Sequence, residues 1–148
     1  GKSLAILGFS FKANTNDTRE SPSIQIAKNL LEEGANLRIH DPKVSKEQIQ
    51  KDLNLFESNN LDDEKKIKNE LSQEGSWIFT ETIEKTFKNT DAVIVLTEWD
   101  EYIHLKWDEL SKLMRQPAWV FDVRSVIDPY QVLNSGLQLW RIGEGTIN

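Results

Sequence analysis

The sequence predicts an α/β fold, with a doubly wound, mainly parallel sheet of Rossmann-like type between two layers of helices. Two observations carry this prediction. Segments of strand character alternate with segments of helical periodicity along all 148 residues. Five consecutive apolar residues at 92–96 predict a strand buried on both faces, which is typical of a parallel sheet covered by helices.

The first β-α-β unit is predicted at the start of the chain. Residues 4–7 form an apolar run, and residues 23–33 show helical periodicity. Ser21 is a favoured N-cap, and Pro22 suits the first helical position, where its missing N–H costs nothing. A right-handed crossover is then expected to lead to a strand at 37–40 that alternates in polarity.

The remaining elements follow in order. Ser45 with Gln48 resembles a capping box that opens a short helix to about residue 55. Residues 55–76 carry many charges and few apolar side chains, so we expect a peripheral acidic insertion without an assigned function. Strands are predicted at 77–79, 92–96, 119–121 and 137–140, and helices at 82–87 and 107–114.

Composition indicates a single soluble domain and excludes several classes of function. The net charge of −6 argues against nucleic acid as a partner, because phosphate neutralisation needs a basic face. No window approaches the ~20 apolar residues that a membrane span requires, so we expect a cytoplasmic protein without membrane contact. The chain has no cysteine, which excludes a thiolate nucleophile or a thiolate metal ligand within it.

The loop after the first predicted strand, residues 8–23, is the strongest candidate site. It offers cations at Lys12 and Arg19, and it opens into a helix N-terminus whose unpaired N–H groups favour anions. The positions after Gly8 lack the further glycines of a dinucleotide-binding G-x-G-x-x-G fingerprint. Side chains must therefore do the binding, and a merely solvated basic loop is the alternative.

Two further strand exits carry polar residues, at 97–100 and 122–124. Because parallel strands end at one edge of a sheet, these exits and the first loop are expected to converge on a ligand site. Arg124 has a planar fork that suits a phosphate or a sugar hydroxyl, and a pair with Asp122 or another local carboxylate is the alternative.

Other polar and aromatic residues near these exits are expected to be structural. Glu98 and Asp100 lack a neighbouring nucleophile or histidine, so they are expected to cap or brace the loop and not to act as catalytic acids. Trp99 is expected in the core. His40 and His104 lie on separate elements without ligand spacing, so no metal site is predicted.

Four ordered motifs resemble the C-terminal domain of the UDP-glucose/GDP-mannose dehydrogenase family, closest to its UDP-glucose 6-dehydrogenase branch. The motifs lie at residues 8–24, 34–44, 91–99 and 121–124. The resemblance implies that residues 1–148 are one UDP-sugar-binding domain, excised from a longer dehydrogenase with an N-terminal NAD-binding domain and a central helical region. The whole enzyme of this family oxidises the sugar C6 alcohol to a carboxylate in two NAD-dependent steps, through a cysteine thiohemiacetal.

By position, the resemblance implies that Phe11 and Lys12 contact the substrate, that Arg124 reaches its sugar, and that Arg19 contacts NAD. It assigns no catalytic residue to this chain, which lacks the cysteine and is expected to be inactive alone. The full-length enzyme is implied to be a homo-oligomer of polysaccharide biosynthesis. Alternatives are a UDP-N-acetylhexosamine or GDP-mannose dehydrogenase domain, or a non-catalytic nucleotide-binding or interaction domain.

Two residues depart from the family pattern. Val123 stands where glycine is common before the arginine, and a β-branched residue avoids positive φ, so the turn that carries Arg124 is expected to differ. His40 replaces the usual tyrosine before Asp41, which is expected to alter packing only.

Overall fold

The computed structural model describes residues 1–58 and 75–148, and the predicted strands and helices occur in it in the predicted order, with three further short elements. The strands are β1 (Ser3–Leu7), β2 (Asn36–His40), β3 (Ser76–Phe79), β4 (Ala92–Val95), β5 (Trp119–Asp122), β6 (Gln138–Arg141) and β7 (Gly145–Ile147). The helices are α1 (Pro22–Glu32), α2 (Lys46–Leu53), α3 (Ile83–Phe87), α4 (Asp100–Ile103), α5 (Trp107–Leu110) and α6 (Pro129–Asn134), and the 3-10 helix η2 is Ser111–Leu113.

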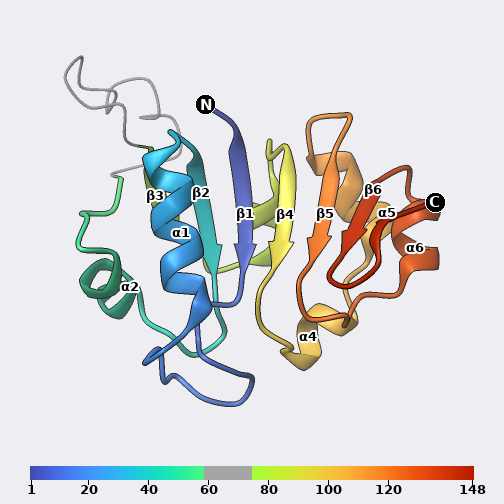
Figure 1. Ribbon diagram of the computed structural model, residues 1–148. Coiled ribbons are helices and arrows are strands. Elements are labelled where there is room, and N and C mark those ends of the chain that lie inside the picture. The colour runs from blue at the N-terminus through green and yellow to red at the C-terminus, as the bar shows by residue number, and fades with distance from the viewer. Residues whose placement is uncertain (59–74) are drawn as a thin grey trace.

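The strands form one seven-stranded sheet in the order β3-β2-β1-β4-β5-β6-β7 (Figure 1). Strands β1 to β6 pair in parallel, and β7 joins β6 antiparallel. The strand β1 pairs with β2 on one side and with β4 on the other, so the direction of winding reverses between β1 and β4. This arrangement confirms the doubly wound, mainly parallel fold, and it brings the exits of β1, β4 and β5 to one edge.

Two helices begin where their capping residues predict. The Ser21 hydroxyl accepts a hydrogen bond from the Ser23 N–H at 3.2 Å, and Pro22 occupies the first helical position of α1. The Ser45 hydroxyl accepts from the Gln48 N–H at 3.2 Å and starts α2. The Gln48 side chain donates to Asp52 instead of returning to the cap, so only half of the predicted capping box forms.

The second half of the chain departs from the prediction in its short elements. The helix predicted at 107–114 ends as α5 at Leu110 and continues only as the 3-10 helix η2. In the same segment, the Ser111 hydroxyl donates to the Asp108 carbonyl, which competes with regular helix pairing. The elements α4, α6 and β7 were not predicted, although Asp128 and Pro129 give α6 a regular cap and first residue.

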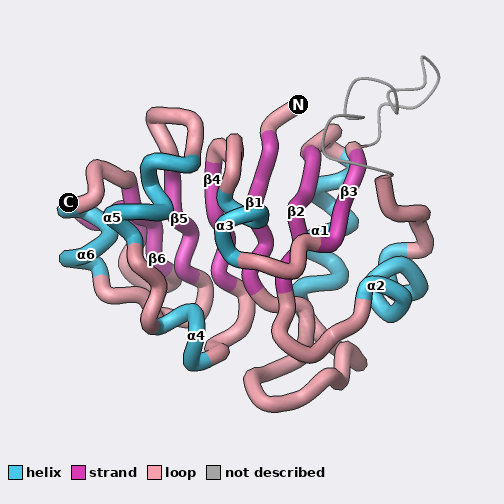
Figure 2. Tube along the Cα trace, turned by 180° about the vertical axis from the view of Figure 1, so that it is seen from behind, coloured by secondary structure: helices cyan, strands magenta, loops and turns pink. Residues whose placement is uncertain are grey.

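Two apolar cores lie on opposite faces of the sheet, because residues alternate along each strand. In β1, Leu4 and Ile6 pack on the face of α1, while Ala5 and Leu7 pack on the other face. Figures 1 and 2 show α1 on one face over β2, and α3 and α5 on the other. The sequence predicts alternating polarity in β2, but all five of its residues are buried, so neither side of this strand is exposed.

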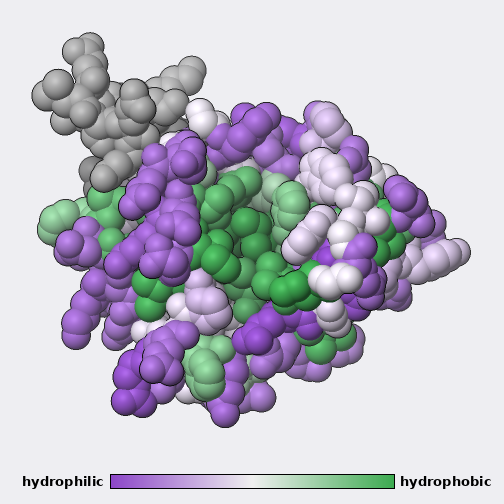
Figure 3. Space-filling view, viewed as in Figure 1, coloured by the Kyte–Doolittle hydropathy of each residue, from purple (hydrophilic) through white to green (hydrophobic). Residues whose placement is uncertain are grey.

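One part of the α1 face carries aromatic side chains without a helix over them. Trp119 stacks on Phe121 with ring centroids 5.7 Å apart, and Phe121 lies 6.2 Å from Trp140. All three side chains are half-buried. Among the described elements, no helix lies over β5 and β6 on this face (Figure 1), and the space-filling view of the same side shows pale and green residues there (Figure 3).

The predicted insertion at 55–76 falls mostly on residues 59–74, which lie outside the described residues. At its start, the Glu57 carboxylate accepts a hydrogen bond from the Phe79 N–H at 2.6 Å, and the Ser58 N–H donates to the Trp77 carbonyl. None of the described helices has both the length and the apolar character that a membrane crossing demands.

Candidate functional site

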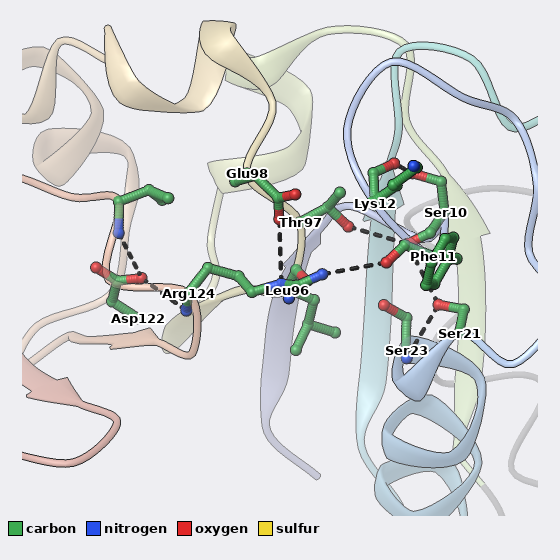
Figure 4. A network of polar contacts seen from close by, with 11 residues as sticks. Ser10, Phe11, Lys12, Ser21, Ser23, Leu96, Thr97, Glu98, Asp122 and Arg124 are labelled. Atoms are coloured by element: carbon green, nitrogen blue, oxygen red, sulfur yellow. Dashed lines mark hydrogen bonds and ion pairs between the residues drawn. The ribbon is translucent and has the colours of Figure 1, made fainter.

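The candidate site lies where β1, β4 and β5 end. These strands are neighbours and run parallel, so the loops that leave them start side by side. Figure 4 shows the Arg124 side chain extended toward the Phe11 backbone, with Glu98 beside it. We call the group formed by Ser10, Phe11, Lys12, Glu98 and Arg124 the strand-end site.

A buried carboxylate fixes the start of the β1–α1 loop. Asp41, which follows β2 and is 4% exposed, accepts hydrogen bonds through Oδ2 from the N–H groups of Phe9 and Ser10 at 2.8 and 3.1 Å. Its Oδ1 accepts from the N–H groups of Lys43 and Val44 at 2.8 and 2.9 Å. The loop that carries the candidate residues is therefore held by β2 through charge-assisted hydrogen bonds.

Two hydroxyl groups tie the same loop to its other neighbours. The Ser21 hydroxyl, at the start of α1, donates to the Phe9 carbonyl at 3.0 Å. The Thr97 hydroxyl, just after β4, donates to the Ser10 carbonyl at 3.2 Å. Both residues are buried, so these bonds connect the loop with α1 and with β4 out of reach of water.

The Arg124 side chain reaches from the end of β5 to the β1–α1 loop (Figure 4). Its Nε donates to the Leu96 carbonyl at 3.0 Å, and its Nη2 donates to the Phe11 carbonyl at 3.1 Å. Its Nε also lies 3.2 Å from Oε2 of Glu98. The guanidinium thus joins all three strand exits, and its carboxylate partner is Glu98 and not Asp122.

The turn that carries Arg124 is built around Asp122, which is fully buried. The Asp122 carboxylate accepts from the N–H groups of Arg124 and Ile127 at 3.1 and 2.9 Å, and Arg141 lies 3.6 Å from it. The turn takes its positive φ at Ser125, where φ is 57°, and not at the valine before the arginine. The β-branched side chain at position 123 is therefore compatible with this turn.

Phe11 and Lys12 lie on the exposed side of the loop. The Phe11 side chain is 42% exposed, and the Lys12 ammonium lies 5.6 Å from the centroid of the Phe11 ring. The Phe11 carbonyl is the group that binds Arg124. The structure thus brings together the three residues for which the sequence predicts a substrate contact, Phe11, Lys12 and Arg124.

Arg19 lies further along the same loop and is 88% exposed. Its guanidinium forms two bonds with Asp17, from Nε to Oδ1 at 3.0 Å and from Nη2 to Oδ2 at 2.9 Å. The hydrogen bonds from Arg19 lower the pKa of Asp17 to about 2, and the same pair raises the pKa of Arg19. No described contact joins Arg19 to the strand-end site.

The other residues considered from the sequence have structural positions. Trp99 is 6% exposed and lies in the core. The buried His40 has its Nδ1 2.8 Å from the Tyr102 hydroxyl, and its burial lowers its pKa. His104 is exposed beside Asp100, and no group of three metal-ligating side chains occurs in residues 1–58 and 75–148.

Sequence reasoning missed the residues that hold the site in place. Asp41 and Asp122 were not identified as loop anchors, and Thr97 was seen only as part of a polar exit. A signal was present, because each aspartate directly follows a predicted strand and precedes a turn. Aspartate in that position commonly accepts main-chain N–H groups of the following residues.

The start of the first β-α-β unit does not fit a dinucleotide. In dinucleotide-binding folds the loop after the first strand is glycine-rich, and an acid after the second strand binds a ribose hydroxyl. Here Phe9 and Ser10 follow Gly8, and a Cβ added to Gly8 would collide with Thr97. Asp41, at the end of β2, is buried and already accepts four N–H groups.

Comparison with known proteins places the chain in a family. The sequence profile of the UDP-glucose/GDP-mannose dehydrogenase family, UDP binding domain, matches residues 5–129. The chain is 38% identical over 146 residues to UDP-glucose 6-dehydrogenase 1 of Arabidopsis thaliana, and 37% identical over 143 residues to UDP-glucose 6-dehydrogenase of Drosophila melanogaster. These matches cover 97% of this chain, but only 30% and 28% of the two relatives.

Solved structures of dehydrogenases share the fold. The NDP-N-acetyl-D-galactosaminuronic acid dehydrogenase from Methanosarcina mazei Go1 superimposes with a TM-score of 0.72 at 24% identity, over 98% of this chain and 25% of that one. A UDP-glucose dehydrogenase from Pyrobaculum islandicum gives 0.60 at 24% identity, over 94% and 24%. The match over residues 5–129 and the similarity over 97% of this chain lead to one conclusion: the chain belongs to the UDP-glucose/GDP-mannose dehydrogenase family and corresponds to its UDP binding domain.

Proposed function

We propose that residues 1–148 form one domain, the C-terminal UDP-sugar-binding domain of an NAD-dependent UDP-glucose 6-dehydrogenase. The whole enzyme oxidises UDP-glucose to UDP-glucuronate in two steps. The proposal is supported by the identity of 38% and 37% to two relatives that carry this name. It is also supported by the family match, because that match is to a UDP binding domain.

In this proposal Phe11, Lys12 and Arg124 bind the substrate. The observation that carries it is the hydrogen bond from Arg124 Nη2 to the Phe11 carbonyl, which joins the β5 exit to the loop that bears Lys12. A lysine ammonium suits the diphosphate as a compact charge, whereas an arginine fork suits directed bonds to sugar hydroxyls or phosphate oxygens. The site lies at the switch point of the sheet, where open α/β folds bind their ligands.

The cofactor is proposed to bind mainly to another domain of the enzyme. The first β-α-β unit of this chain does not fit a dinucleotide, and the chain has no cysteine that could act as nucleophile. Arg19, exposed and paired with Asp17, is proposed to contact NAD held by the N-terminal domain. The proposed partners of this domain are the N-terminal and central domains of the same enzyme. The full-length enzyme is proposed to be cytoplasmic, to form a homo-oligomer and to act in polysaccharide biosynthesis.

The test uses the full-length enzyme and compares Arg124→Ala with Arg115→Ala. Arg115 also pairs with a carboxylate, Asp91 at 2.7 Å, but these residues precede β5 and β4 and so lie at the opposite edge of the sheet. We expect Arg124→Ala to lower kcat/KM for UDP-glucose, because it removes a partner of a charged ligand. The fall corresponds to a loss of about 2–5 kcal/mol in the free energy of transition-state binding. Arg115→Ala is expected to leave it unchanged.

The same assay separates the alternative functions. Turnover of a UDP-N-acetylhexosamine or of GDP-mannose in place of UDP-glucose would assign the domain to another branch of the family. Binding of a nucleotide sugar without NAD reduction by the full-length protein would support a non-catalytic domain. Wild-type kinetics in Arg124→Ala would remove this residue from the site.

A further inference from the structure

The contacts of Arg124 occupy only one edge of its guanidinium. A guanidinium has five N–H groups in a fixed plane. Nε donates to the Leu96 carbonyl and lies 3.2 Å from the Glu98 carboxylate as an ion pair, and Nη2 donates to the Phe11 carbonyl. Among the described residues no acceptor binds Nη1, and the side chain is 33% exposed. The Nη1 edge is therefore free to meet a ligand.

Glu98 is rigidly placed for its contact with this arginine. It lies between Thr97 and Trp99, which are 0% and 6% exposed, so its main chain is anchored on both sides. Thr97 is further fixed by its hydrogen bond to the Ser10 carbonyl. The Oε2 atom of Glu98 is buried and accepts no hydrogen bond from the described residues, and it lies 3.2 Å from Nε as an ion pair, although the side chain as a whole is 40% exposed.

Stability alone is a weak explanation for this ion pair. Pairs of this exposure contribute about 0–1 kcal/mol to folding. A carboxylate beside a site for an anionic diphosphate also repels the ligand. Neither stability nor direct ligand binding therefore explains the contact, and its remaining effect is to orient the Arg124 guanidinium. A guanidinium bound along one edge presents its other edge in a fixed direction.

We propose that Glu98 is a positioning residue for nucleotide-sugar binding. Its carboxylate holds the Nε edge of Arg124 and directs the Nη1 edge toward the sugar or the adjoining phosphate. The proposal rests on the proposed role of Arg124 in substrate binding. It extends that role by naming Glu98, in the loop after β4, as the side chain that determines how Arg124, in the turn after β5, faces the ligand.

The test measures kcat and KM for UDP-glucose in the full-length enzyme with Glu98→Gln, Glu98→Asp and Glu98→Ala. Glu98→Gln keeps an acceptor oxygen at the same reach, and we expect kcat/KM within about threefold of the wild type. The shorter Asp and the truncated Ala lose the 3.2 Å contact, and we expect about tenfold losses. Glu109→Ala, which removes an exposed glutamate of α5, serves as the matched control.

A double-mutant cycle separates positioning from a general effect on the fold. In an Arg124→Ala background, Glu98→Asp is expected to have no further effect on kcat/KM, because no arginine remains to be oriented. Equal losses in both backgrounds would overturn the proposal, and so would an unchanged or raised kcat/KM in Glu98→Asp. If the wild-type enzyme fails to oxidise UDP-glucose, the proposed function is wrong. That result is distinguishable from failure of the positioning role of Glu98, which is judged from the variants of an active enzyme.

Discussion

Two buried aspartates, at the scale of single residues, hold the loops that form the strand-end site. Asp41 fixes the loop after β1, and Asp122 fixes the turn after β5. Each carboxylate lies at the end of a parallel strand and binds main-chain N–H groups of neighbouring turns. A buried charge of this kind stabilises the fold only while its hydrogen bonds are complete.

Replacement of Asp41 by Asn tests the first of these anchors. Each Asp41 oxygen accepts two N–H groups, so an amide in either orientation turns its own N–H atoms toward two main-chain donors. We expect the free energy of unfolding to fall by about 2–3 kcal/mol, the cost of leaving buried donors unpaired. Urea denaturation of the 148-residue chain measures it.

Asp128→Asn is the matched control for that substitution. Asp128 is the N-cap of α6 and accepts one exposed N–H, from Tyr130 at 3.0 Å. Asn is as good an N-cap as Asp, so a change below about 0.5 kcal/mol is expected. If both variants lose the same free energy, the anchoring role given to Asp41 is wrong.

The helix α4 and the strand β2, at the scale of elements, are joined by a buried polar pair. The Tyr102 hydroxyl of α4 donates to the His40 carbonyl at 3.1 Å and lies 2.8 Å from His40 Nδ1. The two rings also meet edge to face, with centroids 5.6 Å apart. Because β2 continues into Asp41, this pair connects the exit of β4 with the anchor of the β1–α1 loop.

This pair makes stability depend on pH in a defined direction. Burial lowers the pKa of folded His40 below its usual 6.5, and the neighbouring Asp41 opposes this shift less strongly. As the pH falls below about 6.5 the unfolded chain takes up the proton first, so the free energy of unfolding decreases. Above pH 7 His40 is neutral in both states, and its titration has no effect there.

We expect urea denaturation to show a smaller loss of stability between pH 7 and pH 5 in His40→Asn than in the wild type. The comparison uses the difference between the two proteins, because burial raises the pKa of Glu101 and gives a pH dependence of opposite sign. Identical slopes in the two proteins would contradict a buried, neutral His40.

The elements that could be predicted from the sequence are those that local chemistry specifies. The helix α1 has an N-cap, a proline and an apolar face, and β4 has an apolar run, so both were placed within two residues. The elements α4 and β7 have four and three residues and no such signal, and they form through contacts with other elements. The position of α4 depends on a contact with His40, which is distant in sequence, and that of β7 depends on pairing with the preceding strand β6.

The meeting of the three strand exits was predictable from the sequence, but the contacts between their side chains were not. Parallel strands required that the exits of β1, β4 and β5 meet, which was enough to group Lys12 with Arg124. Which carboxylate would pair with Arg124 was open, because the sequence offers Asp122 or another local carboxylate as its partner. In the structure Arg124 pairs with Glu98, because the buried Asp122 carboxylate already accepts hydrogen bonds from N–H groups of its own turn.

The whole molecule has one well-covered half and one half with an aromatic face. Around β1 to β3 both sides of the sheet carry helices, whereas over β5 and β6 the α1 side carries the half-buried row of Trp119, Phe121 and Trp140 (Figures 1 and 3). An open parallel sheet ordinarily has both faces covered. The loss of unfolding free energy when an aromatic side chain is removed can be compared between the two halves. This comparison shows how well the aromatic face is covered.

We expect Trp140→Ala to destabilise the 148-residue chain by about 1–2 kcal/mol, because part of its side chain already meets water. Trp77→Ala is the matched comparison, since Trp77 is 1% exposed and donates from Nε1 to the Leu55 carbonyl at 2.9 Å; a loss of about 3–5 kcal/mol is expected. Urea denaturation at two protein concentrations measures both. Equal losses would mean that Trp140 is as well covered as Trp77, and a loss that grows with protein concentration would show that a second copy of the chain covers it.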